Sequence, residues 1–130
     1  MPQTPHSPAV KLARAHVEAW GRKDFDTARS SLAPNVTVTT STTNPDIPRA
    51  DLAGVDDYMQ GLMLFAQSIV PGGVQVTDST GDDRYALLMV TTKVDGPPYG
   101  KLTIRNARLY RFDDNDKIAA EQVIFYTAPN

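Results

Sequence analysis

The sequence predicts a single α+β domain, in which helices from the first half of the chain pack on one face of a twisted, mainly antiparallel sheet. The length of 130 residues fits one packed core, and so does a composition of 41% hydrophobic and 22% charged residues. Hydrophobic residues recur mostly at helical spacing up to about residue 70 and mostly alternate beyond it. We expect residues 1–7 to be a flexible lead-in, residues 8–127 the domain and residues 128–130 a tail.

The predicted helices cover residues 8–20, 25–32 and 55–70. Ser7 is a suitable N-cap for the first helix, and Asp24 is one for the second. Each helix carries a stripe of apolar residues at spacings of three and four. The stripe of the third helix is the widest, which indicates that this helix is heavily buried.

Alternating and β-branched residues predict five strands. The first is the segment NVTVTT, and four further strands follow a Pro-Gly-Gly break. Their ranges are 35–40, 74–79, 84–94, 101–112 and 117–127. Residues 41–53 hold two prolines and two aspartates and predict a long loop. Loops of this length often act as lids or binding segments, so we expect this loop to be mobile and to form the rim of a binding pocket.

Charge and residue usage exclude several classes of protein. Thirteen Lys and Arg against fifteen Asp and Glu leave no basic excess for binding nucleic acid. The absence of cysteine and the presence of only two histidines argue against a metal site. We find no signal peptide, no stretch of about 18 apolar residues, and no P-loop or dinucleotide fingerprint. We therefore expect a cytoplasmic protein that needs no membrane, metal or cofactor.

Polar residues interrupt the apolar face of the last two predicted strands. Alternation places Asn106 and Arg108 on the inward face of strand 101–112, and it places Glu121 among apolar neighbours in the next strand. A plain core avoids such groups, whereas a ligand pocket uses them.

A symmetric turn centred on Asp114 and Asn115 sets a register in which Arg108 lies directly opposite Glu121. Inside a pocket, this pair would hold a carboxylate against a guanidinium, ready to position water or to hydrogen-bond a substrate oxygen. The alternative is a cross-strand ion pair on a wet face, which contributes about 0 to 1 kcal/mol. His16, at the edge of the first helix's apolar stripe, either reaches the same pocket or is a hydrogen-bonded core residue.

Two stretches carry a resemblance to a known family. The segments VEAWGRKDFDTARSSLAPNVTV and ARLYRFDDNDKIAAEQVIFY resemble the nuclear transport factor 2-like superfamily, especially its SnoaL-like and ketosteroid isomerase-like small enzymes, over residues 8–127. The resemblance implies a curved, mixed or antiparallel sheet wrapped around three helices, a cone-shaped, cystatin-like α+β barrel. It also implies a hydrophobic pocket and a homodimer formed through the outer face of the sheet.

The resemblance matches known active sites only in part. Ketosteroid isomerases use a helix-one tyrosine, a carboxylate base ending the first strand and a protonated aspartate on the penultimate strand. These places fall on His16, Thr40 and Arg108, which argues against steroid isomerisation by that mechanism. Limonene epoxide hydrolase-like members use a carboxylate–arginine–carboxylate relay with Tyr and Asn, and Arg108, Glu121 and Asn106 resemble part of it. For the Asp/His pair of SnoaL-like cyclases, Glu121 and His16 are stand-ins.

Two hypotheses follow from these residues. The first is an isomerase, cyclase, lyase or hydrolase acting on a lipophilic, oxygenated small molecule, with Glu121 as acid or base and Arg108 stabilising negative charge. The second is a non-catalytic ligand-binding or dimeric assembly module of the same fold. The catalytic candidates are Glu121, Arg108 and His16, and the substrate-binding candidates are Asn106, Tyr110, Tyr58, Trp20 and Thr40.

Overall fold

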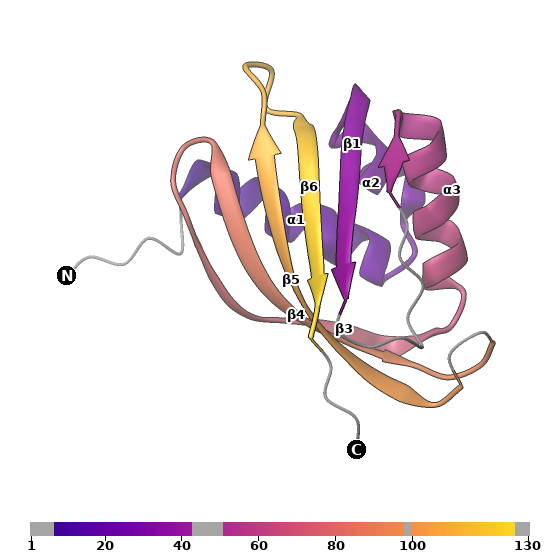
Figure 1. Ribbon diagram of the computed structural model, residues 1–130. Helices are drawn as coiled ribbons and strands as arrows, with labels where there is room; N and C mark the ends of the chain where they lie inside the picture. The colour runs from indigo at the N-terminus through magenta and orange to yellow at the C-terminus, as the bar shows by residue number, and fades with distance from the viewer. Residues whose placement is uncertain (1–6, 43–50, 98–99, 127–130) are drawn as a thin grey trace.

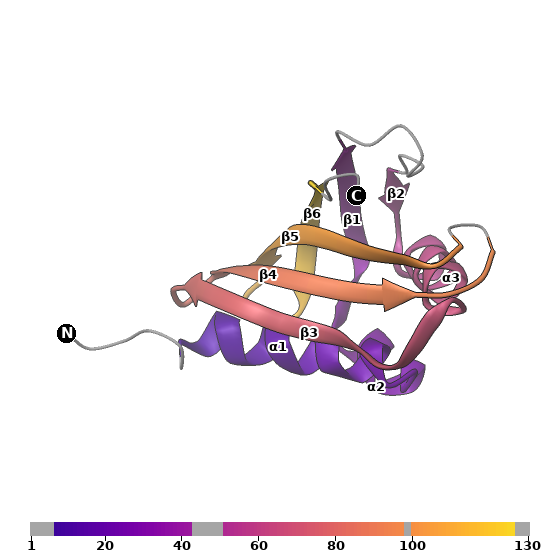
Figure 2. The same ribbon diagram turned by 90° about the horizontal axis from the view of Figure 1, so that it is seen from below.

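A computed structural model describes residues 7–42, 51–97 and 100–126, and it confirms the α+β prediction. Helices α1 (Pro8–Gly21), α2 (Phe25–Ser30) and α3 (Val55–Ala66) pack against one face of a curved sheet that does not close (Figures 1 and 2). The strands are β1 (Leu32–Thr42), β2 (Leu52–Ala53), β3 (Ile69–Gly81), β4 (Tyr85–Val94), β5 (Leu102–Phe112) and β6 (Ile118–Phe125).

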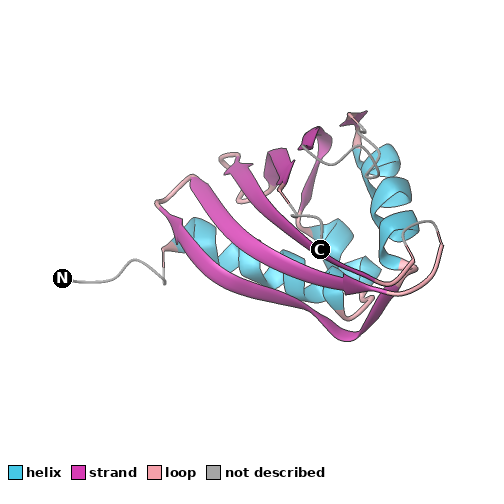
Figure 3. Cartoon of the chain, turned by 60° about the horizontal axis from the view of Figure 1, so that its bottom comes forward, coloured by secondary structure: helices cyan, strands magenta, loops and turns pink. Residues whose placement is uncertain are grey.

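The sheet is mixed, with the strand order β2-β1-β6-β5-β4-β3. Strand β1 pairs in parallel with β6, while the other neighbours pair antiparallel. This pairing places the first strand beside the last, as Figure 1 shows. The sheet curls around the helices (Figure 3). Helix α1 contacts β3, β4 and β5, and α3 contacts β1 and β2. Helix α3 therefore covers the β2–β1 end of the strand order, opposite to the β3 end.

Helix α1 begins as its sequence predicts. The Ser7 hydroxyl accepts a hydrogen bond from the Val10 backbone N–H at 3.2 Å, which caps the helix. The apolar stripe of α1 then faces the inner side of the sheet, and both surfaces are fully excluded from solvent where they meet. The largest side chains buried there are Trp20, Tyr110, Phe112, Leu88, Ile104 and Ile118.

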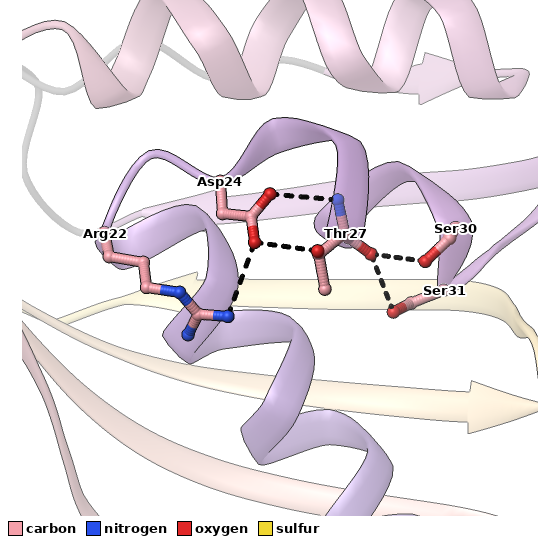
Figure 4. Close-up of polar contacts among 5 residues, drawn as sticks. All are labelled: Arg22, Asp24, Thr27, Ser30 and Ser31. Atoms are coloured by element: carbon pink, nitrogen blue, oxygen red, sulfur yellow. Dashed lines mark hydrogen bonds and ion pairs between the residues drawn. The ribbon is translucent and has the colours of Figure 1, made fainter.

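A polar cluster holds the short helix α2 (Figure 4). The Asp24 carboxylate accepts hydrogen bonds from the Thr27 N–H at 3.3 Å and the Thr27 hydroxyl at 2.7 Å, and Arg22 contacts it at 3.5 Å. At the other end, the hydroxyls of Ser30 and Ser31 donate to the Thr27 carbonyl. The helix therefore ends at Ser30, two residues before the predicted end.

Three other boundaries differ from the prediction by three or more residues. Helix α3 ends at Ala66 rather than 70, and β3 begins at Ile69 and runs through the Pro-Gly-Gly segment, because an irregular register before Val74 absorbs it. Strand β1 begins at Leu32 rather than 35. Part of the predicted loop forms the two-residue strand β2 against β1. The rest of that loop, like most of the predicted lead-in and tail, lies outside the described residues.

The predicted register between β5 and β6 is wrong by two residues. Tyr110, rather than Arg108, lies opposite Glu121, and Arg108 lies opposite Val123. The turn is not symmetric about Asp114 and Asn115: the Asp113 N–H donates to the Lys117 carbonyl at 2.8 Å, and a bulge follows between Arg111 and Phe112. Because a shift of two residues preserves the face of each side chain, Arg108 and Glu121 still point to the same side.

The structure also shows how α3 is fixed to the sheet. Gly54, whose φ of 91° suits glycine, precedes the helix, and its N–H donates to the Val36 carbonyl of β1 at 2.7 Å. This bond places Tyr58, one turn into the helix, over the inner face of the sheet. None of the helices among the described residues is long and apolar enough to cross a membrane.

Candidate functional site

A cavity of about 430 Å³ lies between α3 and the inner faces of β1, β5 and β6. Most of its lining is apolar and comes from β1, β2, α3 and β6. The polar residues among those that line it are Thr40, Tyr58, Gln67, Arg108 and Glu121. An apolar hollow with a few polar groups is the usual form of a small-molecule site.

Glu121 and Arg108 form a buried ion pair in the wall of this cavity. The Arg108 Nη1 donates to Glu121 Oε2 at 2.7 Å, and the two residues are only 5% and 3% exposed. They are diagonal neighbours on adjacent strands rather than opposite partners, and the long arginine side chain spans the offset. The expected contact is therefore present although the register that predicted it is wrong.

Arg108 has three further contacts that fix its guanidinium. Its Nε donates to Asn106 Oδ1 at 2.8 Å. Its guanidinium carbon lies 4.9 Å from the centroid of the Trp20 ring and 5.9 Å from that of Phe65, within the range of cation–π attraction. Burial lowers the pKa of Arg108 and the charge of Glu121 raises it, with a net shift upward. The guanidinium is therefore a permanent positive charge beside the carboxyl group.

Tyr58 links the ion pair to His16. The Tyr58 hydroxyl is hydrogen-bonded to Glu121 Oε1 on one side and lies 2.9 Å from His16 Nε2 on the other. Burial and the charge of Glu121 raise the pKa of Tyr58 well above its ordinary value, so the phenol keeps its proton. The chain of contacts thus runs from β6 through α3 to α1.

His16 is fully buried and is anchored on its other side by α2. Its Nδ1 lies 3.1 Å from the Ala28 carbonyl oxygen, to which it donates. Burial lowers the pKa of His16 from 6.5 to about 3, and the charge of Arg108 also lowers it, while the bond to Ala28 opposes the shift. At neutral pH the imidazole by itself is therefore uncharged.

The structure brings four of the predicted site residues to the cavity wall. Glu121, Arg108, Tyr58 and Thr40 line it. Tyr58 was predicted as a substrate-binding residue, and its bonds to both His16 and Glu121 depend on a helix–sheet contact that sequence alone cannot set. Gln67 also lines the cavity and was missed, since a polar residue just after a helix carries no distinctive sequence signal.

The other four predicted residues lie behind the wall. His16 sits behind Tyr58, and Asn106 reaches the site only through its bond to Arg108. Trp20 packs on the Arg108 guanidinium, and the Tyr110 ring meets the His16 ring edge-on, with their centroids 5.9 Å apart. These side chains support the cavity residues rather than line the cavity.

The chemistry of this site is that of a carboxyl group held by two donors. The guanidinium of Arg108 approaches one carboxyl oxygen and the phenol of Tyr58 the other, in surroundings that exclude most water. Such a group can give or take a proton from a molecule in the cavity. Over the described ranges, no group of three or more His, Cys, Asp or Glu residues is arranged to hold a metal ion.

Comparisons with known proteins agree with this architecture. The family model of the SnoaL-like domain matches residues 13–121. A crystal structure of a protein from Kribbella flavida DSM 17836 is 26% identical, covers 91% of this chain and 86% of that chain, and has a TM-score of 0.74. No curated protein matches the chain.

Two more distant structures share the fold. A putative SnoaL-like polyketide cyclase from Shewanella denitrificans OS-217 is 11% identical, with 90% of this chain and 89% of that chain covered and a TM-score of 0.74. An LEH-like epoxide hydrolase from M. tuberculosis is 16% identical, with 91% and 82% covered and a TM-score of 0.68. Together with the match of the family model over most of the chain, the fold shows that this chain belongs to the SnoaL-like domain family.

Proposed function

We propose that the cavity binds a small, lipophilic, oxygen-bearing molecule and that Glu121 exchanges a proton with it, as an isomerase, cyclase, lyase or hydrolase does. The observation that carries the proposal is the position of Glu121, a nearly buried carboxyl group in the wall of a largely apolar cavity. Removing a carboxyl group from water is costly, and the bond from Arg108 offsets that cost for Glu121 while its side chain still lines the cavity.

Arg108 is the second member of the proposed machinery. A guanidinium has five N–H donors, and the bonds to Asn106 and Glu121 use two of them. The remaining donors suit an oxygen that gains negative charge when Glu121 removes or supplies a proton nearby. Proton transfer of this kind needs no cofactor, and the names of the two more distant structures, a putative polyketide cyclase and an epoxide hydrolase, agree with an oxygenated ligand.

A thermal-shift screen tests whether the cavity takes such ligands. We would use lipophilic epoxides, enones, steroids and aromatic polyketides. A ligand at about 100 times its Kd adds about 2.7 kcal/mol to the stability of the folded state, a rise of several degrees for a domain of this size. The proposal expects reproducible rises within one chemical class, and no rise with any class would count against it.

Two variants at the end of α3 show whether the ligand occupies this cavity. Leu64 lines the cavity and is 58% exposed, so Leu64→Trp fills its mouth without disturbing the core. Its neighbour Met63 is 46% exposed and is not among the lining residues, so Met63→Trp is the matched control. Loss of the shift in Leu64→Trp alone locates the ligand, whereas equal shifts in both variants place it elsewhere.

The second candidate is a non-catalytic, dimeric assembly module, and the outer face of the sheet favours it. Tyr85 and Ile124 are 46% and 40% exposed, and a hollow of about 230 Å³ lined partly by Tyr85 and Leu109 lies on the same face. Apolar side chains on a sheet face suit a partner surface. A homodimer through this face and a cytoplasmic location remain predictions, and the dimer is compatible with either function.

A further inference from the structure

The hydrogen bonds that join Ala28, His16, Tyr58 and Glu121 in series need more hydrogens than the three side chains ordinarily carry. Three links stand in line: His16 Nδ1 to the Ala28 carbonyl at 3.1 Å, His16 Nε2 to the Tyr58 hydroxyl at 2.9 Å, and the Tyr58 hydroxyl to Glu121 Oε1. Each link requires one hydrogen between its two heavy atoms. The carbonyl cannot supply one, so all three must come from the imidazole, the phenol and the carboxyl group.

In their ordinary states these groups supply only two. A neutral imidazole carries one hydrogen, a phenol carries one and a carboxylate carries none. One link then sets two lone pairs against each other at hydrogen-bond distance, between side chains that are almost wholly buried, since His16, Tyr58 and Glu121 are 0%, 4% and 3% exposed. Buried polar atoms that face each other without a hydrogen are costly.

We propose that the chain His16–Tyr58–Glu121 binds one additional proton and that Tyr58 passes this proton between buried His16 and cavity-facing Glu121. This inference rests on the proposed function, in which Glu121 exchanges protons with a ligand, and it assigns His16 the part of a proton reserve. His16 is thus a positioning residue, one layer behind the cavity.

The transfer balances atom by atom. In the first form Glu121 Oε1 carries the proton and donates to the Tyr58 oxygen, while the Tyr58 hydroxyl donates to His16 Nε2. In the second form the Tyr58 proton has moved to Nε2 and the Glu121 proton has moved to the Tyr58 oxygen, which leaves an imidazolium and a carboxylate. Each step breaks one O–H bond and forms one N–H or O–H bond, and the phenol is neutral in both forms.

The surroundings favour the first form at rest. The charged and titratable groups that face His16, Tyr58 and Glu121 are Arg108 and Tyr110, both from β5. Arg108 disfavours a second positive charge on His16, and burial lowers the pKa of the imidazole to about 3. Arg108 Nη1 donates to Oε2, so in the first form the ion pair becomes a charge-assisted hydrogen bond to a carboxylic acid, and Oε1 carries the proton toward Tyr58. The carboxyl group therefore faces the cavity as an acid and becomes a base when its proton moves to His16.

The sequence makes this inference testable by NMR without crowded spectra. The chain has two glutamates, Glu18 and Glu121, and two histidines, His6 and His16. Carbon-13 labelling of glutamate and nitrogen-15 labelling of histidine thus give two sites each, and exposed Glu18 is an internal carboxylate reference. Glu18→Gln and His6→Gln assign the signals.

At pH 7 we expect the Glu121 signal to be that of a carboxylic acid, with one hydrogen on His16 Nδ1 and none on Nε2. An imidazolium beside a Glu121 carboxylate also supports the proposal, since it is the second form of the chain. A neutral His16 beside a Glu121 carboxylate overturns it, and this spectrum of the unaltered protein decides the matter even if no variant folds.

Two tyrosine variants isolate the role of the Tyr58 hydroxyl. The rings of Tyr58 and Tyr110 both lie 5.9 Å from the His16 ring, both are buried, and only the Tyr58 hydroxyl stands in the chain. In Tyr58→Phe the additional proton loses its place, so the Glu121 signal shifts to that of a carboxylate. In Tyr110→Phe the signal stays unchanged. The proposal is overturned if Tyr58→Phe retains the acid signal.

This test is independent of ligand binding. If the proton count holds but no ligand binds, only the proposed function fails. If ligands bind and react through Glu121 while the spectra show neutral imidazole and carboxylate, only the proton reserve fails.

Discussion

The chemistry of Glu121 is decided by three neighbours from three different elements. Arg108 on β5 holds one of its oxygens and Tyr58 on α3 holds the other, while His16 on α1 lies one hydrogen bond further away. No local sequence pattern joins these residues, which are separated by up to 105 positions (121 − 16). The carboxyl group acquires these neighbours only when the sheet packs against the helices.

We expect removal of the Glu121 carboxyl group to be strongly destabilising. Glu121→Leu leaves the permanently charged Arg108 buried without its partner, which costs about 3 to 5 kcal/mol. Asp56→Leu is the matched control, because it removes a carboxylate from an exposed pair with Arg29 and costs at most about 1 kcal/mol. Urea unfolding measures both values, and similar losses for the two variants would show that burial does not set the strength of the pair.

Stability against pH should separate the two tyrosine variants. In Tyr58→Phe, no additional proton on Glu121 compensates for the lowered pKa of His16. Because the unfolded protein then binds a proton at His16 that the folded protein does not, stability present above pH 6.5 is lost as the pH falls toward about 3. The loss approaches about 1.4 kcal/mol per pH unit, the value for one proton. In Tyr110→Phe and in the unaltered protein, the additional proton held by the folded protein offsets the proton that His16 takes up on unfolding, so we expect a smaller slope.

The measurement is the free energy of unfolding in urea at several pH values. Titratable groups other than His16, Tyr58 and Glu121 affect both variants alike. The difference in slope between Tyr58→Phe and Tyr110→Phe therefore measures the contribution of these three residues. Equal slopes in the two variants would contradict the additional proton. A steeper slope in Tyr58→Phe is the expected outcome.

The β5–β6 hairpin is the element on which the site depends. Its turn sets which residues of the two strands meet, and a shift of one residue would turn Glu121 away from Arg108. Asp113 organises the turn, since its carboxylate accepts from the N–H groups of Asn115 and Lys117 at 2.9 and 3.0 Å. Asp116 completes it with a φ of 60°.

Asp116 offers a test of that turn. A β-branched residue is strained at positive φ, so Asp116→Val should cost about 1 to 2 kcal/mol, whereas Asp116→Gly should cost nothing or add up to about 1 kcal/mol. Thermal or urea unfolding measures the difference. If the valine and glycine variants were equally stable, the left-handed conformation at this position would not matter to the hairpin.

Alternation predicted which residues face the site, and it did not predict their register. The period of two along β5 places Asn106, Arg108 and Tyr110 on one face wherever the partner strand begins. The register depends on the turn and on the bulge near Phe112, which sequence specifies only weakly. The predicted contact between Arg108 and Glu121 is present because the error was an even number of residues.

The same limit applies to the elements around the site. Strand β2 is two residues long and exists only through its pairing with β1, so the strand propensity of its residues does not predict it. The junction of α3 and β3 was misplaced because Ile69, three residues after Ala66, continues the apolar spacing of the helix, yet Ile69 pairs with Val94 in the sheet. Tertiary pairing overrode local preference at both places.

The two proposals use opposite faces of the mixed sheet. Its inner face holds the cavity and the buried chain of hydrogen bonds, and its outer face carries Tyr85, Ile124 and the smaller hollow. These faces are on opposite sides of the same strands, so a partner could cover the outer face without blocking the cavity. The proposed catalysis and the proposed assembly are therefore separable by substitution.

We expect analytical ultracentrifugation to find a dimer formed through the outer face. An interface of about 1,200 to 2,000 Å² would be disrupted by a buried charge, so Ile124→Lys should sediment as a monomer. Met63→Lys places the same charge on α3, at a residue of similar exposure, and should remain a dimer. A monomer of the unaltered protein at every concentration would contradict this arrangement.

Hydrogen exchange into a bound ligand tests the role of Glu121 most directly. Each ligand from the thermal-shift screen is incubated in D₂O with the unaltered protein, with Glu121→Gln or with Glu18→Gln, the same change at an exposed position. Mass spectrometry then measures deuterium in the ligand or its product. We expect the unaltered protein and Glu18→Gln to label it at equal rates, and Glu121→Gln to be about 100-fold slower or worse. Undiminished labelling by Glu121→Gln would show that this carboxyl group does not carry the proton.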